Sequence, residues 1–197
     1  MTKKIMFNDR YGLTEAVLSG KKTQTRRILK SEPQEYLVLK KNVFIDGQGI
    51  KFIPKYNVGE VVAVAQSYKE IFKEAQNDWW NDIYENYRSG LTTSEVAGYK
   101  NKMFTRADFM PHQIEITNVR IERLQDISRE DCIKEGIEPM RTQYKALIYG
   151  FKDFLKDVWL WKASPKEAYQ LLISRISGKK VWDENPFVFV YEFKLVK

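Results

Sequence analysis

The chain has 197 residues, 43% hydrophobic and 30% charged, a balance typical of globular proteins and not of disordered chains. One cysteine, Cys132, excludes an intramolecular disulfide, and one histidine, His112, leaves no Cys/His set with zinc-site spacing. The formal net charge of +7 favours polyanionic partners without selecting one of them.

Neither a targeting segment nor a membrane span is expected from the sequence. The basic opening MTKKIMFNDR reaches Asp9 before any apolar stretch of signal-peptide length, and no apolar run approaches about 18 residues. We therefore expect a cytoplasmic protein without a membrane partner, and the residues indicate no metal and no cofactor.

The first third of the chain predicts short strands and one short helix. KKIMF at 3–7 predicts a strand, and the apolar spacing in 11–19 predicts a helix that ends at Gly20, where a left-handed residue can cap it. Short β-type runs, which predict a hairpin-rich stretch, follow at 36–40, 43–46 and 50–53. The apolar run VVAVA at 61–65 predicts a buried strand.

The middle of the chain has a weak signal and then a long strand. Residues 69–100 mix polar and aromatic side chains, and we interpret them as an insertion with some helix. HQIEITNVRIERL at 112–124 alternates apolar and polar residues, as a half-buried strand does, with an irregularity predicted near Thr117 and Asn118.

A short helix is predicted next, in SREDCIKEG at 128–136. Ser128 and Asp131 fit a helix-opening cap, and Gly136 fits the end of the helix. Glu135 therefore falls in its last turn.

Two further helices and a strand are predicted after it. Residues 144–161 carry apolar side chains on a helical stripe, so Trp159 and Trp161 are interpreted as helix packing and not as base-stacking residues. A second helix opens at Ser164 with a capping box and ends at Gly178. FVFVYEFKL, which closes the chain, is apolar on both faces at its start and predicts a central or well-covered strand.

This order of elements predicts an α+β fold. The economical interpretation is a single domain over 1–197, built on a small mixed or mostly antiparallel β-barrel with short helices. Helical insertions at about 69–100 and 142–163 would decorate the barrel.

Four stretches, in this order, resemble the ASCH domains of the PUA-like superfamily, particularly the longer form common in bacteriophages and prophages. They are GKKTQTRR at 20–27, NVGEVVAV at 57–64, ITNVRIERLQDISREDCIKEGI at 116–137 and KKVWDENPFVFVYEF at 179–193. The resemblance implies a PUA-like barrel with an N-terminal helix beside a cleft that binds RNA or a modified nucleoside. The family includes an N4-acetylcytidine amidohydrolase and a member described as a ribonuclease.

The amidohydrolase pattern implies roles for individual residues of this chain. It matches Lys22 as the base, Thr25 as the nucleophile and Glu135 as the proton donor. Phage-type members have an Arg-Glu-Thr-Trp-like stretch after the strand at 60–64, whereas this chain has Gln66 in place of the glutamate.

Several further side chains are predicted to bind the substrate. They are Lys21, Arg26, Arg27, Gln66 and Tyr68. Arg26 and Arg27 alternate in an extended segment, so we expect them to point to opposite faces, and the resemblance places Arg27 in the cleft. Tyr68 is a candidate for stacking on a base.

The residue types fit the hydrolysis of an amide. That reaction needs a nucleophile, a base, an acid and donors for the oxyanion, and GKKTQTRR together with Glu135 contains all four. Lys22 must be neutral part of the time, and burial with neighbouring cations lowers its pKa while Glu135 raises it. Three alternatives stay open: a non-catalytic RNA-binding module, a ribonuclease, and a protein-interaction scaffold with an idle cleft.

Overall fold

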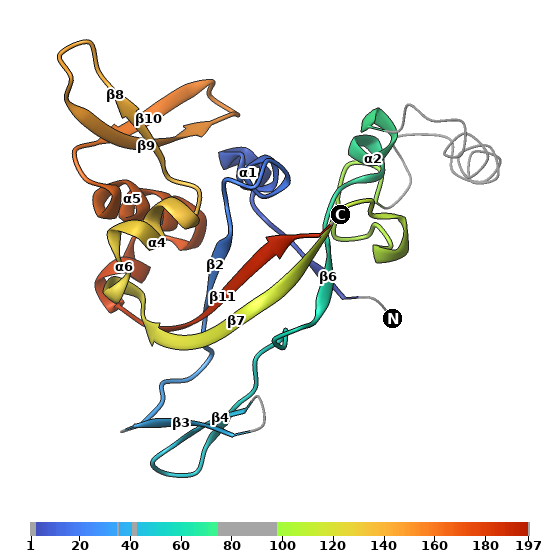
Figure 1. Ribbon diagram of the computed structural model, residues 1–197, viewed down its shortest axis with the longest axis vertical. Coiled ribbons are helices and arrows are strands. Elements are labelled where there is room, and N and C mark those ends of the chain that lie inside the picture. The colour runs from blue at the N-terminus through green and yellow to red at the C-terminus, as the bar shows by residue number, and fades with distance from the viewer. Residues whose placement is uncertain (1–2, 35, 41–42, 75–97, 197) are drawn as a thin grey trace. The chain divides into compact units, whose positions relative to one another are not determined.

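The computed structural model describes residues 3–34, 36–40, 43–74 and 98–196 (Figure 1). The chain divides into two compact units. Unit 1 contains the described residues of Met1–Phe7, Val61–Ile114 and Val196–Lys197, and unit 2 those of Asn8–Glu60 and Glu115–Leu195. The prediction of a single domain stays a prediction.

Unit 1 is organised around two short parallel strands. β1 (Lys4–Ile5) pairs with β6 (Val61–Val64), and the predicted buried strand is confirmed because Val62, Ala63 and Val64 are fully buried. Helix α2 (Tyr68–Glu74) follows β6 and begins the predicted insertion, whose residues 75–97 lie outside the described part of the chain. The 3-10 turn η2 (Ala107–Phe109) is the other helical element described in this unit.

In unit 2, three strands lie side by side with β11 in the middle. They are β2 (Gln24–Ile28), β11 (Phe187–Leu195) and β7 (Gln113–Arg123), whose first two residues belong to unit 1 (Figure 1). β11 and β2 are antiparallel, with Tyr191 opposite Thr25 and Phe189 opposite Arg27. The prediction of a well-covered final strand is confirmed.

The burial pattern of β7 shifts at the predicted irregularity. Thr117 and Asn118 are both exposed, and the buried positions are even-numbered before them but continue at Val119 after them. Beyond the shift, Arg120 and Glu122 are two residues apart and therefore lie on one face of the strand.

A small antiparallel sheet confirms the predicted hairpin-rich stretch. Its strands, in spatial order, are β3 (Leu37–Lys40), β4 (Val43–Asp46) and β5 (Lys51–Phe52). Asp46 stabilises the turn after β4, because its carboxylate accepts hydrogen bonds from the backbone N–H groups of Gln34, Gln48 and Ile50.

The helices of unit 2 begin and end at the residues that the sequence indicates. α1 (Leu13–Leu18) is followed by Gly20 in a left-handed conformation. Ser128 caps α4 (Arg129–Lys134) and Ser164 caps α5 (Pro165–Ser177), each by accepting a hydrogen bond from the backbone N–H three residues on. The short elements η1 (Asp9–Tyr11), η3 (Leu124–Asp126) and α6 (Lys180–Glu184) were not predicted.

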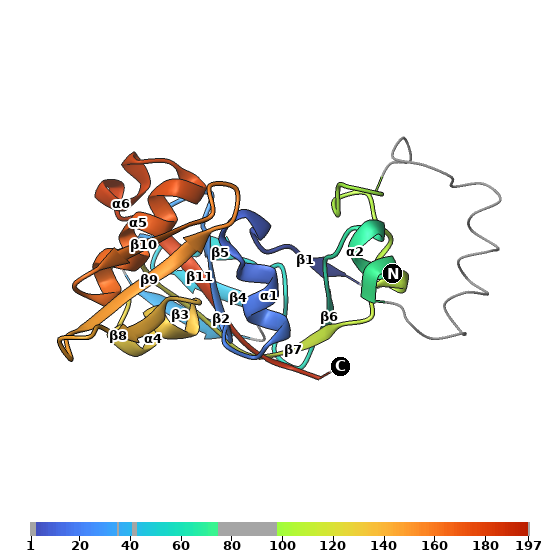
Figure 2. The same cartoon turned by 90° about the horizontal axis from the view of Figure 1, so that it is seen from above.

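The predicted helix over 144–161, and with it the helical insertion at 142–163, is wrong. This segment forms most of an antiparallel sheet that α5 covers on one side (Figure 2). In spatial order its strands are β10 (Val158–Lys162), β9 (Leu147–Asp153) and β8 (Glu138–Arg141).

Two properties of the segment override the helical spacing of its apolar residues. It is rich in β-branched and aromatic residues, which favour strands. Lys145 and Asp157, in the two turns, have φ of 63° and 53°, a conformation that no α-helix continues. Tyr149 and Phe151 of β9 point to the buried side of the sheet. Trp159 and Trp161 are strand residues opposite Lys152 and Gly150, on the other side, so the prediction that they belong to the packing face of a helix is wrong.

The described architecture is mixed α+β with antiparallel sheets and few helices, as predicted. Among these residues, no helix combines the length and the apolar character needed to cross a membrane.

Candidate functional site

Backbone hydrogen bonds hold the loop after α1 against the end of α4. The N–H of Lys22 donates to the carbonyl of Ala16 at 2.7 Å, and the N–H of Thr23 donates to the carbonyl of Lys134 at 2.9 Å. Gly136, with φ of 100°, ends α4, and a Cβ there would lie 3.7 Å from Cδ of Lys22. The glycine therefore turns the chain, and 3.7 Å is an ordinary van der Waals distance, so the positive φ and not the space beside Lys22 requires glycine here.

Lys22 and Glu135 form a buried pair. Lys22 Nζ lies 2.6 Å from Glu135 Oε2 and donates to the backbone carbonyl of Glu135 at 2.7 Å. Only 2% of Lys22 and 4% of Glu135 are exposed. Burial lowers the pKa of Lys22, and the negative charge of Glu135 is the main influence that opposes it.

Arg26 connects this pair to two further carboxylates. Its Nη1 donates to Glu135 Oε1 at 3.1 Å, and its Nη2 donates to Glu122 Oε1 at 2.5 Å and to Asp131 Oδ2 at 3.1 Å. Burial opposes the positive charge of Arg26, but Glu135, Tyr169 and Glu122 together raise its pKa. Arg26 therefore keeps its charge inside the protein.

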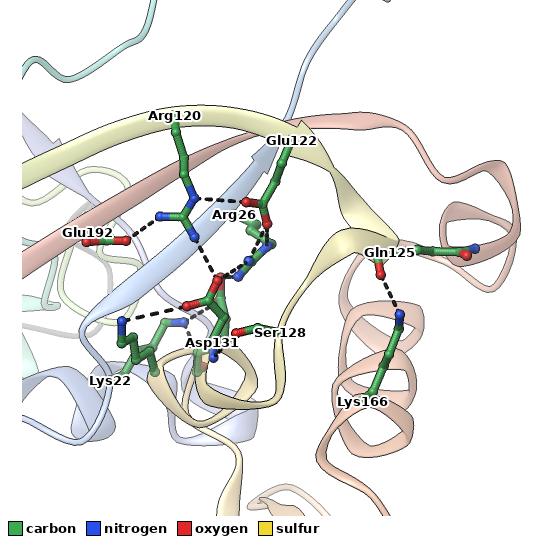
Figure 3. Close-up of polar contacts among 11 residues, drawn as sticks. Lys22, Arg26, Arg120, Glu122, Gln125, Ser128, Asp131, Lys166 and Glu192 are labelled. Atoms are coloured by element: carbon green, nitrogen blue, oxygen red, sulfur yellow. Dashed lines mark hydrogen bonds and ion pairs between the residues drawn. The ribbon is translucent and has the colours of Figure 1, made fainter.

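Arg120 extends the contacts across β7 and β11 (Figure 3). It donates to Glu122 Oε2 at 2.9 Å and to Asp131 Oδ2 at 2.8 Å, and it pairs with Glu192. Three cations and four carboxylates form a connected set that we call the carboxylate network, and Lys134 Nζ lies 3.8 Å from Oδ1 of its member Asp131. Its members are Lys22, Arg26, Arg120, Glu122, Asp131, Glu135 and Glu192.

Helix α4 and strand β2 bring the two sides of the network together. Asp131 and Glu135 are four residues apart, so they lie on one face of α4, where two like charges repel. Arg26 contacts both and offsets that repulsion. Gln24, two residues before Arg26 on β2, donates to Asp131 Oδ1 at 3.0 Å when its amide nitrogen faces that oxygen.

Two other buried side chains near the network, Cys132 and Tyr169, have raised pKa values. Burial raises the pKa of the Cys132 thiol to about 12, so it is not a thiolate nucleophile near neutral pH. Burial also raises the pKa of Tyr169, whose ring centroid lies 5.9 Å from Arg26 Cζ.

Thr25 and Arg27 lie on the other face of β2 from Arg26. Strand alternation puts them there, since Gln24 and Arg26 both face Asp131. Thr25 is buried and Arg27 is exposed. The prediction that the two arginines point to opposite faces is confirmed, and it is Arg26 that reaches Glu135.

The other residues predicted to bind the substrate are Lys21, Gln66 and Tyr68, and each has a hydrogen-bond or ion-pair partner. Lys21 Nζ lies 3.2 Å from Glu138 Oε2 at the surface. Gln66 and Tyr68 belong to unit 1, where Gln66 is buried and donates to Glu74 Oε1 at 2.8 Å. The Tyr68 hydroxyl accepts from the backbone N–H of Arg106 at 3.3 Å.

Sequence reasoning did not identify several members of the network as site residues. Arg120, Glu122 and Glu192 read as the polar face of half-buried strands, and Asp131 read as a helix cap. For the three strand residues the sequence showed only the alternation of polar and apolar positions. It gave no indication of their partners, which belong to other elements.

The Lys22–Glu135 pair can hold one proton in two ways. It is either an ammonium with a carboxylate or an amine with a carboxylic acid, and burial lowers the pKa of Lys22, which favours its amine form. The neutral form places a base beside an acid. In the described ranges, no group of three or more His, Cys, Asp or Glu residues could hold a metal ion.

Comparison of the chain with protein-family models, with curated proteins and with solved structures found no match.

Proposed function

We propose that this chain is a PUA-like ASCH protein that binds a modified nucleoside beside Lys22 and Glu135 and hydrolyses N4-acetylcytidine to cytidine. The observation that carries the proposal is the 2.6 Å contact between Lys22 Nζ and Glu135 Oε2 in a buried setting. The resemblance supplies the substrate class, and the contact supplies a base and an acid.

In the first half of the reaction, the resemblance makes the Thr25 hydroxyl the nucleophile that attacks the acetyl carbon and passes its proton to neutral Lys22. Because Thr25 lies on the face of β2 away from Arg26, this step requires substrate binding to bring the Thr25 hydroxyl and Lys22 together. The tetrahedral intermediate then collapses and expels the N4 amine of cytidine, which takes a proton from Glu135. Acetyl-Thr25 remains, and the pair is left as ammonium and carboxylate.

In the second half, the pair is reset by transfer of one proton from Lys22 to Glu135 across their direct contact. Lys22 then takes a proton from water, and the hydroxide attacks the acetyl ester. Acetic acid leaves and Thr25 recovers its proton from Glu135. A second transfer of one proton from Lys22 to Glu135 returns the pair to its neutral form, so one amide and one water become one amine and one acetic acid.

The charges around the site support hydrolysis over a phosphate clamp. Of the four cations in GKKTQTRR, Lys22 and Arg26 are buried against carboxylates, which leaves Lys21 and Arg27 at the surface. Burial and Glu135 have the largest effects on the pKa of Lys22. The positive charges of Arg27 and Arg26 have smaller effects, and both lower it. The exposed Arg27 is therefore the better candidate to anchor a substrate.

The test is release of cytidine from N4-acetylcytidine, followed by chromatography. We expect turnover by the purified chain and a loss of about a hundredfold or more in Thr25→Ala and in Lys22→Met, the range that base and nucleophile removal produces. Lys51→Met, at an exposed position of β5, is the matched control and should keep the rate.

Thr25→Ala should still bind the nucleoside, which thermal stabilisation by the ligand measures. The proposal is overturned if the purified chain releases no cytidine under conditions in which a known amidohydrolase does.

A further inference from the structure

Two tryptophans form a stacked pair on the open face of the β8–β10 sheet. Trp159 and Trp161 are two residues apart on β10 and therefore share a face. Their ring centroids are 4.7 Å apart and their planes differ by 8°. Trp159 is 40% exposed although it is one of the largest apolar side chains.

The stack lies against bare backbone. Gly150 is opposite Trp161 in the β9–β10 register, and a Cβ at Gly150 would lie 2.6 Å from Cε3 of Trp161. The opposite face of the sheet carries the core contacts, since Phe151 is buried and its ring centroid lies 5.5 Å from that of Tyr11. The tryptophan face is thus not needed to close the core.

The acidic residues of this sheet are each matched by a cation. Residues 138–162 contain three acidic side chains. Asp153 pairs with Arg10 at 2.8 Å, Asp157 with Lys152 at 2.6 Å and Glu138 with Lys21 at 3.2 Å.

Four cations of the same segment are left over. They are exposed, and within the described residues no ion pair joins them to a carboxylate: Arg141, Lys145, Lys156 and Lys162. Lys145 and Lys156 lie in the two turns, so they stand at opposite ends of the strands. In the strand register Arg141 is opposite Leu147 and Lys162 is opposite Tyr149, so these two cations lie on the face of Tyr149 and Phe151. The tryptophan face is therefore flanked by the turn lysines Lys145 and Lys156, one at each end of the strands.

We propose that this face binds single-stranded nucleic acid, with a base stacked on Trp159 and phosphates held by the turn lysines Lys145 and Lys156. Stacking platforms flanked by Lys and Arg are how proteins hold single strands without reading their sequence. A second copy of the chain fits less well, because a symmetric contact would bring the same positive charges together. The binding surface does not depend on hydrolysis at Lys22.

The experiment is fluorescence anisotropy with labelled oligo-uridine and oligo-deoxythymidine of about 12 nucleotides, a length such surfaces can span, at about 50 mM salt. We expect saturable binding that Trp159→Ala weakens by about 5- to 100-fold and that Trp159→Phe largely restores. Tyr36→Ala, which removes an aromatic ring that is 66% exposed outside this sheet, is the control and should bind normally.

Salt dependence provides an independent readout. Lys145→Ala and Lys156→Ala should each reduce the slope of log affinity against log salt by about 0.7, the value for one phosphate contact on a single strand. Equal affinity for the two oligonucleotides indicates stacking and phosphate contacts alone, and a preference for oligo-uridine adds contacts to the 2′-hydroxyl.

Three results would overturn the proposal. They are absence of binding at low salt, unchanged affinity in a Trp159→Ala variant whose circular dichroism shows a folded chain, and a concentration-dependent dimer that Trp159→Ala abolishes.

Discussion

Lys22 and Arg26 lie four residues apart in a basic stretch, yet both direct their charge at carboxylates inside the protein. The two cations are not equivalent there. The planar guanidinium of Arg26 can bond Glu122, Asp131 and Glu135 at once and cannot lose its proton. Lys22 makes a compact ammonium whose pKa burial lowers, so it is the member that can serve as a base.

Replacement of Arg26 by alanine should destabilise the protein strongly. It would leave three partly buried carboxylates without their shared cation, a loss of about 3–5 kcal/mol in the free energy of unfolding. Arg27→Ala, at the next and exposed position, should cost about 0.5 kcal/mol, as surface substitutions do. Urea unfolding of both variants measures the difference, and equal losses would contradict the assignment of Arg26 to the network.

At the scale of elements, the β9–β10 hairpin explains both a wrong prediction and the stacked tryptophans. Apolar residues three and four apart between 144 and 161 fit a helix, but the same letters also alternate between a buried and an open face. Pairing with β8 and the cover from α5 decide for strands. In this hairpin Gly150 leaves room for the backbone of Leu160 and the ring of Trp161 on the neighbouring strand, a role that it would not have in a helix.

Gly150→Ala should distort this hairpin. The added Cβ would lie 2.4 Å from the carbonyl oxygen of Leu160 and would press on the ring of Trp161, so we expect a loss of about 1–3 kcal/mol and a changed near-ultraviolet circular dichroism signal. Gly49→Ala, where no atom lies within 4 Å, strains only its own left-handed backbone and should keep that signal. An unchanged spectrum in Gly150→Ala would argue against the close packing of Trp161 on Gly150.

At the scale of the whole molecule, the buried charges make stability depend on pH at both ends of the range. The Arg10 hydrogen bond lowers the pKa of Asp153. Burial raises the pKa of Asp131, but Gln24 and the arginines 26 and 120 bring it below 3.8. Stability from both carboxylates is present above pH 3.8 and is lost as pH falls through their lower folded-state values.

Lys22 makes the free energy of unfolding depend on pH in the alkaline range. Its folded-state pKa is below the ordinary 10.5, so the unfolded chain binds more protons between the two values and stability rises with pH there. We expect the wild-type free energy of unfolding to gain on that of Lys22→Met as pH approaches 10.5, with a slope of at most about 1.4 kcal/mol per pH unit. A difference that does not vary with pH, in urea unfolding followed by tryptophan fluorescence, would contradict the shift.

The local features of this protein could be predicted from neighbouring residues in the chain. Ser128, Ser164, Gly20 and Gly136 mark helix ends because capping and left-handed turns depend on a few neighbouring residues. Strands β6, β7 and β11 could be predicted from alternating or continuous apolar residues, because these patterns also depend only on neighbouring residues.

Contacts between distant segments determine which charges pair and whether an ambiguous apolar pattern forms a helix or a strand. Lys22 and Glu135 are 113 positions apart, and Arg120 reaches Glu192 across 72. No local signal encodes such pairs, since each partner alone reads as an ordinary polar residue of its element. Similarly, an apolar pattern that fits two periods becomes a strand only when a neighbouring strand supplies its hydrogen bonds and a helix covers one of its faces.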